Sequence, residues 1–432
     1  MKLLILFLLL ITQANAKVNI DQWTTPEGAK VLFTQTKGLP MLDVALNFDA
    51  ASSRDGDKYG LASLTSSLIG TASKYHTEEQ IINQFESLGT EFSSASLKDM
   101  SIISMRSLTR RDILQSSLNL FAEVVSQVDY QQRYLSREKK QTLRAIEAAK
   151  QSPGSIANKR FNELVFGQHP YAHKKIGSKE SLEKINLADL NQHYKRYYVA
   201  KNLTIALVGD ISKTKAMQIA RQISHGLNSG QKAPRNELVL PLSTTIQEHI
   251  EFPSTQTHLL IGQVGINRTH PDYYPLYLGN HILGGSGLNS LLSQEIREQR
   301  GLAYSTSSYF TKMKSNGFFL INLQTKNSQA NQAKKVVLET LKNFRNNEIN
   351  PQNLQDGKDN IIGGFALETA SNANILTYLS IIGFYELPLD YLSSFTNKIK
   401  DISAKDIKNA YERLINMKRL VVLTVGVKKG LK

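Results

Sequence analysis

The spacing of apolar residues predicts the order of strands and helices in the first half of the chain. Val44, Leu46 and Phe48 alternate with smaller or polar residues, as in a half-buried strand. From residue 61, apolar positions instead recur every three or four residues, which is typical of a helix. The next expected elements are a helix from about Thr77, strands around 91–95 and 102–108, a long helix over about 114–128 and a closing strand around 203–207.

The second half of the chain repeats this order. Its expected elements are a strand near 257–263, a helix around 274–283, a helix with Leu288, Leu291, Leu292 and Ile296, strands over roughly 303–310 and 317–325, and a long helix with Val337, Leu341 and Phe344 on one face. Each half therefore has the pattern of an α+β domain, in which helices cover a mainly antiparallel sheet.

Direct similarity between the halves indicates a duplication. The segment "KINLADLNQHYKRYYVAKNLTIALVGDIS" resembles "DISAKDIKNAYERLINMKRLVVLTVGVKK", and matching residues lie 217 positions apart. The matched pairs are Ile185 and Ile402, Asp189 and Asp406, Tyr194 and Tyr411, and Gly209 and Gly426. We therefore expect two duplicated domains, over 17–227 and 237–432. The polar stretch 228–236 lacks a periodic apolar face and is predicted to be the linker between them.

The first residues have the pattern of an export signal. Lys2 precedes an apolar run from Leu3 to Ile11, and Ala14-Asn15-Ala16 follows as a small-x-small cleavage site. A nine-residue apolar core argues against the alternative, an uncleaved membrane anchor. We expect a signal peptide over 1–16 and an exported, periplasmic mature chain. No later stretch is long and apolar enough to predict a transmembrane span.

Composition narrows the chemistry further. The chain has 432 residues, enough for two domains of about 200 residues each. It has no cysteine, which excludes disulfides, thiolate nucleophiles and thiolate metal ligands. The net charge of +15 is spread along the chain without a nucleic-acid-binding motif, so we expect a solvated basic surface and no nucleic-acid partner.

Two segments resemble the pitrilysin and mitochondrial-processing-peptidase family, the inverted zincins. They are "YGLASLTSSLIGTASK", where active members have a helix with H-x-x-E-H, and "LNSLLSQEIREQRGLAYS", which is similar to a segment of their C-terminal half. The resemblance covers almost the whole mature chain. It implies a clam-shell fold, in which the two domains face each other across a cavity that admits peptide substrates.

The resemblance places the zinc site at residues that cannot make one. Ser63, Ser66 and Ser67 stand where the family has His, Glu and His, and Ala145 stands where it has a further glutamate ligand. Serine is a poor zinc ligand near neutral pH and cannot replace the carboxylate base. Glu138 keeps the first of the family's two glutamates, and Glu147 would need a shifted alignment. We expect no catalytic residue, no metal ligand and no cofactor in this chain.

Other residues give no alternative catalytic centre. His169 and His173 are four residues apart, but Pro170 lies between them and favours a structural turn. His76 precedes Glu78 and Glu79 and is expected to cap the start of a helix. The three serines lack the surroundings of a known nucleophile motif. Gly284-Gly285-Ser286-Gly287 resembles, in shortened form, the glycine-rich loop of the family's non-catalytic subunit, and a plain turn is an equal alternative.

The C-terminal-half segment retains its chemistry. Arg297 and Tyr304 have the family's spacing, and the resemblance implies that this pair holds the substrate backbone. A guanidinium and a phenol can both donate hydrogen bonds to a carbonyl. The structural alternative is an ion pair of Arg297 with Glu295 or Glu298 and a packed Tyr304 ring. Arg300 is the rival arginine, only four residues before the tyrosine.

Together these features predict a catalytically silent subunit of a heteromeric zinc metallopeptidase. The predicted partner is a family member with an intact H-x-x-E-H helix, which would hold the zinc in a heterodimer, and the substrate is a peptide. Two alternatives remain open. One is a scaffold subunit without a peptidase role, and the other is an active metalloendopeptidase with non-standard ligands.

Overall fold

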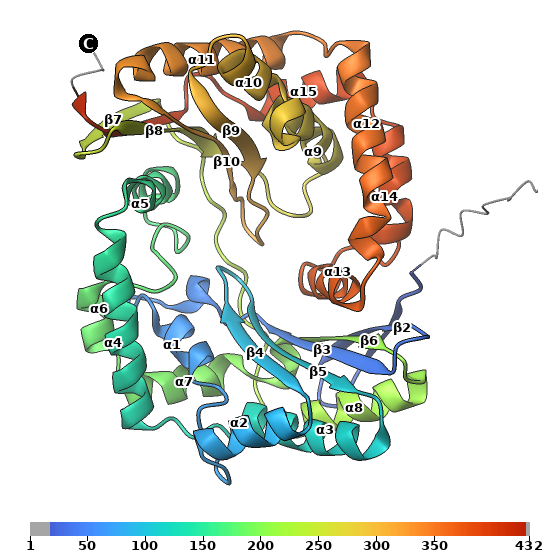
Figure 1. Ribbon diagram of the computed structural model, residues 1–432. Coiled ribbons are helices and arrows are strands. Elements are labelled where there is room, and N and C mark those ends of the chain that lie inside the picture. Colours follow the sequence, from blue (N-terminus) through green and yellow to red (C-terminus); the bar gives the residue numbers. More distant parts are fainter. Residues whose placement is uncertain (1–17, 429–432) are drawn as a thin grey trace, which may run out of the picture.

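The computed structural model describes residues 18–428, so the predicted signal peptide, 1–16, lies outside the described residues. Within this range the chain forms two halves, each a sheet with helices, which face each other (Figure 1). None of the helices in 18–428 combines the length and apolar character needed to cross a membrane.

The first half contains a six-stranded sheet. Its strands are β1 (Asp21–Thr24), β2 (Lys30–Gln35), β3 (Met41–Phe48), β4 (Glu91–Ser96), β5 (Ser101–Leu108) and β6 (Leu203–Gly209). Its helices are α1 (Leu61–Ser67), α2 (Glu78–Ser87), α3 (Arg111–Ser126), α4 (Gln132–Ala149), α5 (Pro153–Phe166), α6 (Lys179–Lys184), α7 (Leu187–Tyr197) and α8 (Lys213–His225). The strand order is β1-β2-β6-β3-β5-β4, and only the β2–β6 pair is parallel.

The second half contains a five-stranded sheet. Its strands are β7 (Ile246–Glu251), β8 (Gln256–Val264), β9 (Ala303–Phe310), β10 (Phe318–Lys326) and β11 (Val421–Gly426). Its helices are α9 (Tyr273–Asn280), α10 (Leu291–Ser293), α11 (Ala330–Asn346), α12 (Pro351–Phe365), α13 (Asn372–Phe384), α14 (Tyr391–Lys400) and α15 (Ala404–Leu414). The strand order is β7-β11-β8-β10-β9, and only the β7–β11 pair is parallel.

The two sheets confirm the duplication. Strands β2-β6-β3-β5-β4 of the first sheet correspond in order and direction to β7-β11-β8-β10-β9 of the second. The similar segments also fold alike, because each begins with a capping box. Asn186 and Asp189 cap α7, and Ser403 and Asp406 cap α15, before the chain enters β6 or β11. The predicted α+β fold of two duplicated, mainly antiparallel domains is confirmed.

The halves exchange one helix each, which the sequence did not predict. Helix α5 packs on β8 and β11 of the second sheet, and α13 packs on β2, β3 and β6 of the first (Figure 1). The contacts are close: a Cβ at Gly383 would lie 2.6 Å from Leu32 Cδ1, and one at Gly262 would lie 2.7 Å from Phe161 Cζ. Each sheet is therefore covered on one face by a helix from the other half.

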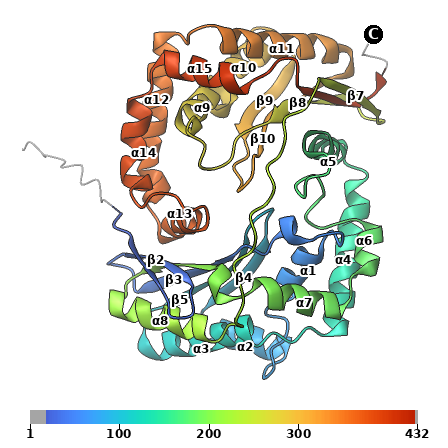
Figure 2. The ribbon, with the colours of Figure 1, turned by 180° about the vertical axis from the view of Figure 1, so that it is seen from behind.

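An extended segment joins the halves. It has neither helix nor strand between the end of α8 and the start of β7, and it runs between the halves at the back of the molecule (Figure 2). Two hydrogen bonds hold this segment in place. Ala233 N donates to Asn202 Oδ1, and Arg54 donates to the Pro234 carbonyl. A cavity of about 640 Å³ lies beside it, lined by residues of both halves such as Asp49 and Lys314.

Candidate functional site

Helix α1, where active relatives would bind zinc, begins at a carboxylate cap. Gly60, with φ +99°, and Ala62 donate their backbone N–H groups to Asp55 Oδ2 and Oδ1 at 2.8 and 2.7 Å. Burial raises the pKa of Asp55 to about 7 although both N–H groups favour its charged form. The helix is thus firmly positioned, and what it presents is decided by Ser63, Ser66 and Ser67.

The serine hydroxyls of α1 are used in packing. Ser66 is buried and accepts a hydrogen bond from Ser101 Oγ at 3.1 Å, and Ser101 in turn contacts Tyr198 Oη at 2.7 Å. Ser67 donates to the Leu64 carbonyl at 3.2 Å, and Ser63 is half-buried. Neutral hydroxyls that take part in such hydrogen bonds offer neither a zinc ligand of useful strength nor a general base.

Helix α4 does not supply the missing carboxylate. It packs beside α1, but Ala145 carries only a methyl group and is exposed. Glu147 is exposed and forms an ion pair with Lys150 at 2.8 Å, and Glu138 is half-buried. Within 18–428 no three His, Cys, Asp or Glu side chains are grouped as metal ligands. The donor set at α1 and α4 therefore does not fit a zinc ion.

The histidines singled out in the sequence have structural contacts. His169 Nδ1 accepts from the backbone N–H of Tyr171 at 3.1 Å in a turn, and His173 stacks on Tyr59 with 4.0 Å between ring centroids. Burial lowers the pKa of His173 to about 4. The expectation that His76 caps a helix was wrong. Thr77 is the cap of α2, and His76 Nδ1 instead lies 2.7 Å from Glu123 Oε1 on α3.

Arg297 and Tyr304 are in direct contact. The Arg297 guanidinium lies over the Tyr304 ring, with 5.0 Å from Cζ to the ring centroid, and the tyrosine is 83% exposed. Arg297 belongs to a π-helical turn, Gln294–Glu298, that follows α10, and Tyr304 is the second residue of the edge strand β9. Gly301, with φ +59°, allows the sharp turn between them.

Arg297 does not form the ion pair with Glu295 or Glu298 that was its structural alternative. Arg300, the rival arginine, takes Glu295, with 2.5 Å between Arg300 Nη1 and Glu295 Oε2. Among the described residues no carboxylate pairs with Arg297, so its guanidinium contacts a ring and keeps its hydrogen-bond donors. Tyr304 projects into solvent instead of packing in the core.

The glycine-rich segment is a compact turn. Gly284 and Gly285 end a π-helical segment, His281–Gly285, and Gly287 begins a 3₁₀ turn. A Cβ at Gly284 would lie 2.7 Å from the backbone nitrogen of Ser308, so glycine lets this turn pack against β9. The segment supports the strand that carries Tyr304.

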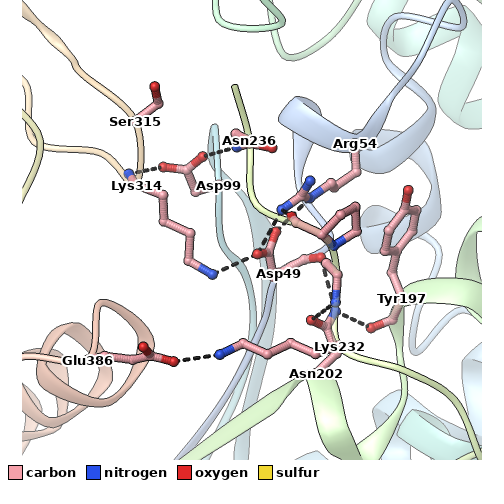
Figure 3. A network of polar contacts seen from close by, with 12 residues as sticks. Asp49, Arg54, Asp99, Tyr197, Asn202, Lys232, Asn236, Lys314, Ser315 and Glu386 are labelled. Atoms are coloured by element: carbon pink, nitrogen blue, oxygen red, sulfur yellow. Dashed lines mark hydrogen bonds and ion pairs between the residues drawn. The ribbon is translucent and has the colours of Figure 1, made fainter. Parts of the chain in front are cut away.

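A buried polar network joins the halves at the β9–β10 loop (Figure 3). Arg54 forms a two-bond ion pair with Asp49 at 2.8 and 2.9 Å, and Lys314 Nζ reaches the same carboxylate at 2.6 Å. Burial raises the pKa of Asp49, but the two cations outweigh it and the net pKa is lowered. Lys314 N also donates to Asp99 Oδ2 at 2.9 Å. No sequence signal linked these residues, because Asp49 and Lys314 belong to different halves.

Comparisons with known proteins show which family the sequence and the fold resemble. A family model described as Insulinase (Peptidase family M16) matches residues 30–178, and one described as Peptidase M16 inactive domain matches residues 184–361. The chain is 26% identical over 446 residues to a Helicobacter pylori protein named Non-peptidase homolog YmxG, which covers 99% of this chain and 98% of that protein. It is 24% identical over 302 residues to a Bacillus subtilis protein named Uncharacterized zinc protease YmxG, over 70% of this chain and 72% of the other.

A solved structure gives a more similar relative. The crystal structure described as peptidase M16 inactive domain from Pseudomonas fluorescens is 38% identical, with a TM-score of 0.92, and covers 95% of this chain and 98% of that one. The two names given to the YmxG relatives disagree about peptidase activity, and in this chain Ser63, Ser66, Ser67 and Ala145 do not fit a zinc site. Both halves and the whole fold nevertheless match one group of proteins, and the chain belongs to the peptidase M16 (insulinase) family.

Proposed function

We propose that this chain is a catalytically silent subunit of a heteromeric zinc metallopeptidase that acts outside the cytoplasm, in the periplasm. Its contribution is substrate binding by Arg297 and Tyr304 and one part of the wall of the peptide chamber. The observation that carries the proposal is the Arg297–Tyr304 contact, kept exposed in a chain whose α1 helix has serine at each zinc and base position.

The pair is suited to hold a peptide carbonyl. The Tyr304 hydroxyl is exposed, and Arg297 retains N–H donors because Glu295 is paired with Arg300. A charged donor makes a shorter and stronger hydrogen bond than a neutral one, and the bond strengthens as negative charge develops on the carbonyl oxygen. The ring below the guanidinium fixes its position without neutralising it.

The zinc of such an enzyme would belong to a partner subunit. Because the residues of α1 and α4 do not fit the metal, the proposed partner is a family member with an intact H-x-x-E-H helix. We expect purification of the mature chain from its native source to recover that partner in near-equal amount. Recovery of only monomers or self-dimers at physiological concentration would contradict the heterodimer.

Metal content separates this proposal from an active peptidase with non-standard ligands. We expect no stoichiometric zinc after purification in zinc-containing buffer, and no peptide cleavage by the chain alone, because no carboxylate or imidazole replaces Ser63, Ser66, Ser67 and Ala145. Elemental analysis is the measurement. One tightly bound zinc per chain with chelator-sensitive cleavage would establish the active-peptidase alternative instead.

The scaffold alternative makes a different prediction. A scaffold subunit would assemble with a partner, but the assembly would have no peptidase activity that depends on this chain. Adding the chain to the isolated partner and measuring peptide cleavage distinguishes the two cases. We expect cleavage to appear or to rise strongly on addition, because the partner alone lacks the Arg297–Tyr304 pair.

A further inference from the structure

A pocket in the C-terminal half, separate from the cavity beside the linker, has the properties of a binding site. It has a volume of about 220 Å³ and lies between α9 and the β9–β10 hairpin. Its walls include Tyr273, Tyr277, Tyr309, Phe310 and Lys312. An apolar cavity of roughly 150 Å³ accommodates benzene. This pocket therefore has room for an aromatic or branched aliphatic group and a small polar head.

Lys312 brings a positive charge into this aromatic pocket. Its Nζ lies 5.1 and 4.8 Å from the ring centroids of Tyr273 and Tyr277, and it donates to Tyr273 Oη at 3.3 Å. In the described part of the chain no carboxylate forms an ion pair with Lys312, and the charged group that acts on it is another cation, Arg268. Burial, with a smaller effect from Arg268, lowers the pKa of Lys312 to about 7. Such a lysine is partly neutral near pH 7 in the free protein, and a bound anion would stabilise its charged form.

Arg268 is a second cation near this pocket, and it lines the neighbouring cavity beside the linker. Its guanidinium lies over Tyr273, with 6.0 Å from Cζ to the ring centroid, and over Tyr385 at 5.6 Å. Its Nε is buried without a hydrogen-bond acceptor, and no ion pair to it is found within 18–428. Asp272, the neighbouring acid in the sequence, is bound by Arg413 at 2.7 Å. The chain's own carboxylates thus leave both cations uncompensated.

The polar groups of the pocket favour a carboxylate over a phosphate. Asn280 and Ser308, which also line it, bond to each other, since Ser308 Oγ donates to Asn280 Oδ1 at 2.9 Å and Asn280 Nδ2 donates to the Ser308 carbonyl at 3.0 Å. The charged donor among the residues that line the pocket is then Lys312, beside the neutral hydroxyls of Tyr277 and Tyr309. A phosphate carries more charge and more acceptor oxygens than a single lysine compensates, whereas a carboxylate needs few donors.

We propose that this pocket binds a carboxylate attached to an apolar group, with Lys312 as its ion-pair partner, Arg268 adding positive potential, and Tyr273 and Tyr277 packing against the apolar part. The carboxylate has two possible sources, the C-terminus of a peptide with an apolar last residue or a small free organic acid. The contacts of the pocket carry this inference, which does not depend on a partner subunit.

Calorimetric titration of the purified full chain tests the proposal. The probes are an acetylated tripeptide ending in leucine with a free carboxylate, the same peptide as its C-terminal amide, and benzoate. We expect the free acid to bind at least tenfold more tightly than the amide, because the amide cannot pair with Lys312. Benzoate that matches the peptide indicates a small acid as the ligand, and much weaker benzoate binding indicates a peptide end.

Matched variants locate the binding. Lys312→Met keeps the length of the side chain and removes the charge, and it should weaken the free acid at least tenfold. Lys326→Met, at an exposed position on β10, should change nothing. If Lys312→Met does not fold, the affinity of Arg268→Gln for the free acid is measured instead and should also be weaker. Equal binding of acid and amide, no binding of either acid, or wild-type affinity in the folded variants would overturn the proposal. Since the isolated chain is titrated, this outcome is independent of peptidase activity with a partner.

Discussion

At the exposed contact between Arg297 and Tyr304, one hydroxyl or one guanidinium group can be removed by a single substitution. Removing one donor from an oxyanion-type site typically lowers turnover by about 10²–10³. We expect Tyr304→Phe and Arg297→Ala each to lower peptide cleavage by the reconstituted complex on that scale. Folding should survive, because Tyr304 is 83% exposed and surface substitutions usually shift stability by less than about 0.5 kcal/mol.

Two controls match these variants closely. Tyr75→Phe removes the hydroxyl of another exposed tyrosine that lies beside a cation, Lys74, in the other half. Arg300→Ala removes the neighbouring arginine, which is already bound to Glu295. Both should leave cleavage near the wild-type rate. If Tyr304→Phe and Arg297→Ala complexes assemble and cleave as wild type does, the pair is structural and the scaffold role is favoured.

His193 predicts a pH dependence of stability. It is 4% exposed, its Nε2 lies 3.0 Å from the Ala50 carbonyl, and burial lowers its pKa to about 4. Between about pH 6.5 and 4 the unfolded state binds a proton at this residue and the folded state does not, so stability falls as the pH falls. We expect the loss from His193 to reach on the order of 3 kcal/mol across that range.

The variant His193→Gln isolates this contribution. Glutamine does not titrate and can still donate to the Ala50 carbonyl, so the difference in unfolding free energy between wild type and variant should shrink as the pH falls. Urea denaturation at several pH values measures it. The difference cancels the titration of Asp55, whose raised pKa acts in the opposite direction. Two parallel stability curves would mean that the pKa of His193 is the same in the folded and unfolded states, which would contradict this prediction.

Some residue-level features could be predicted from the sequence and others could not. The degenerate positions Ser63, Ser66, Ser67 and Ala145 were identified through the resemblance of two short segments to the peptidase family, because such a motif can be read along the chain without knowing how the helices pack. The side chain that Arg297 contacts could not be predicted in this way. Whether it meets Glu295, Glu298 or Tyr304 depends on the π-helical turn and on Gly301, and nothing in the local apolar pattern distinguishes that turn from an α-helix.

At the scale of helices and strands, the duplication was predictable because its signals are local. Apolar stripes and the capping boxes at Asn186 and Ser403 specify each element wherever it packs. The exchange of α5 and α13 is different, since an amphipathic helix shows that one face is buried and not which sheet buries it. Phe161 of α5 is fully buried among Leu260, Phe318 and Leu320 of the second half.

This exchange predicts which half loses amide protection when a core side chain is removed. Phe161→Ala should cost about 3–5 kcal/mol, as should Phe121→Ala, because both rings are fully buried. Phe161→Ala should loosen amide protection in β8, β10 and β11 of the other half, and Phe121→Ala in the first half. Hydrogen exchange by mass spectrometry distinguishes them. Loss confined to the first half in both variants would contradict the packing of α5 on the second sheet.

For the whole molecule, the Asp49–Arg54–Lys314 network closes the two halves on each other. Lys314→Ala leaves Asp49 paired with Arg54, so we expect a cost of about 1–3 kcal/mol, typical of a lost charged hydrogen bond. The loop over 311–317 should then exchange its amides faster, because it has lost the Lys314 Nζ bond to Asp49 and keeps only its backbone bonds to the first half, such as Lys314 N to Asp99 Oδ2. Lys342→Ala, at an exposed lysine on α11, is the control and should leave both quantities unchanged.

The helix exchange also constrains the order in which the chain can be completed during synthesis. The first sheet has its strands once β6 ends at Gly209, but the helix that covers its second face, α13, begins only at Asn372. Helix α5 waits longer still, for β11 at Val421–Gly426. At about 5–20 residues per second, the ribosome needs on the order of 13–50 s to pass from the end of α5 to the start of β11. During this time two apolar surfaces have no covering element, so neither half can mature as an independent unit and the nascent chain must remain open until its last strand is made.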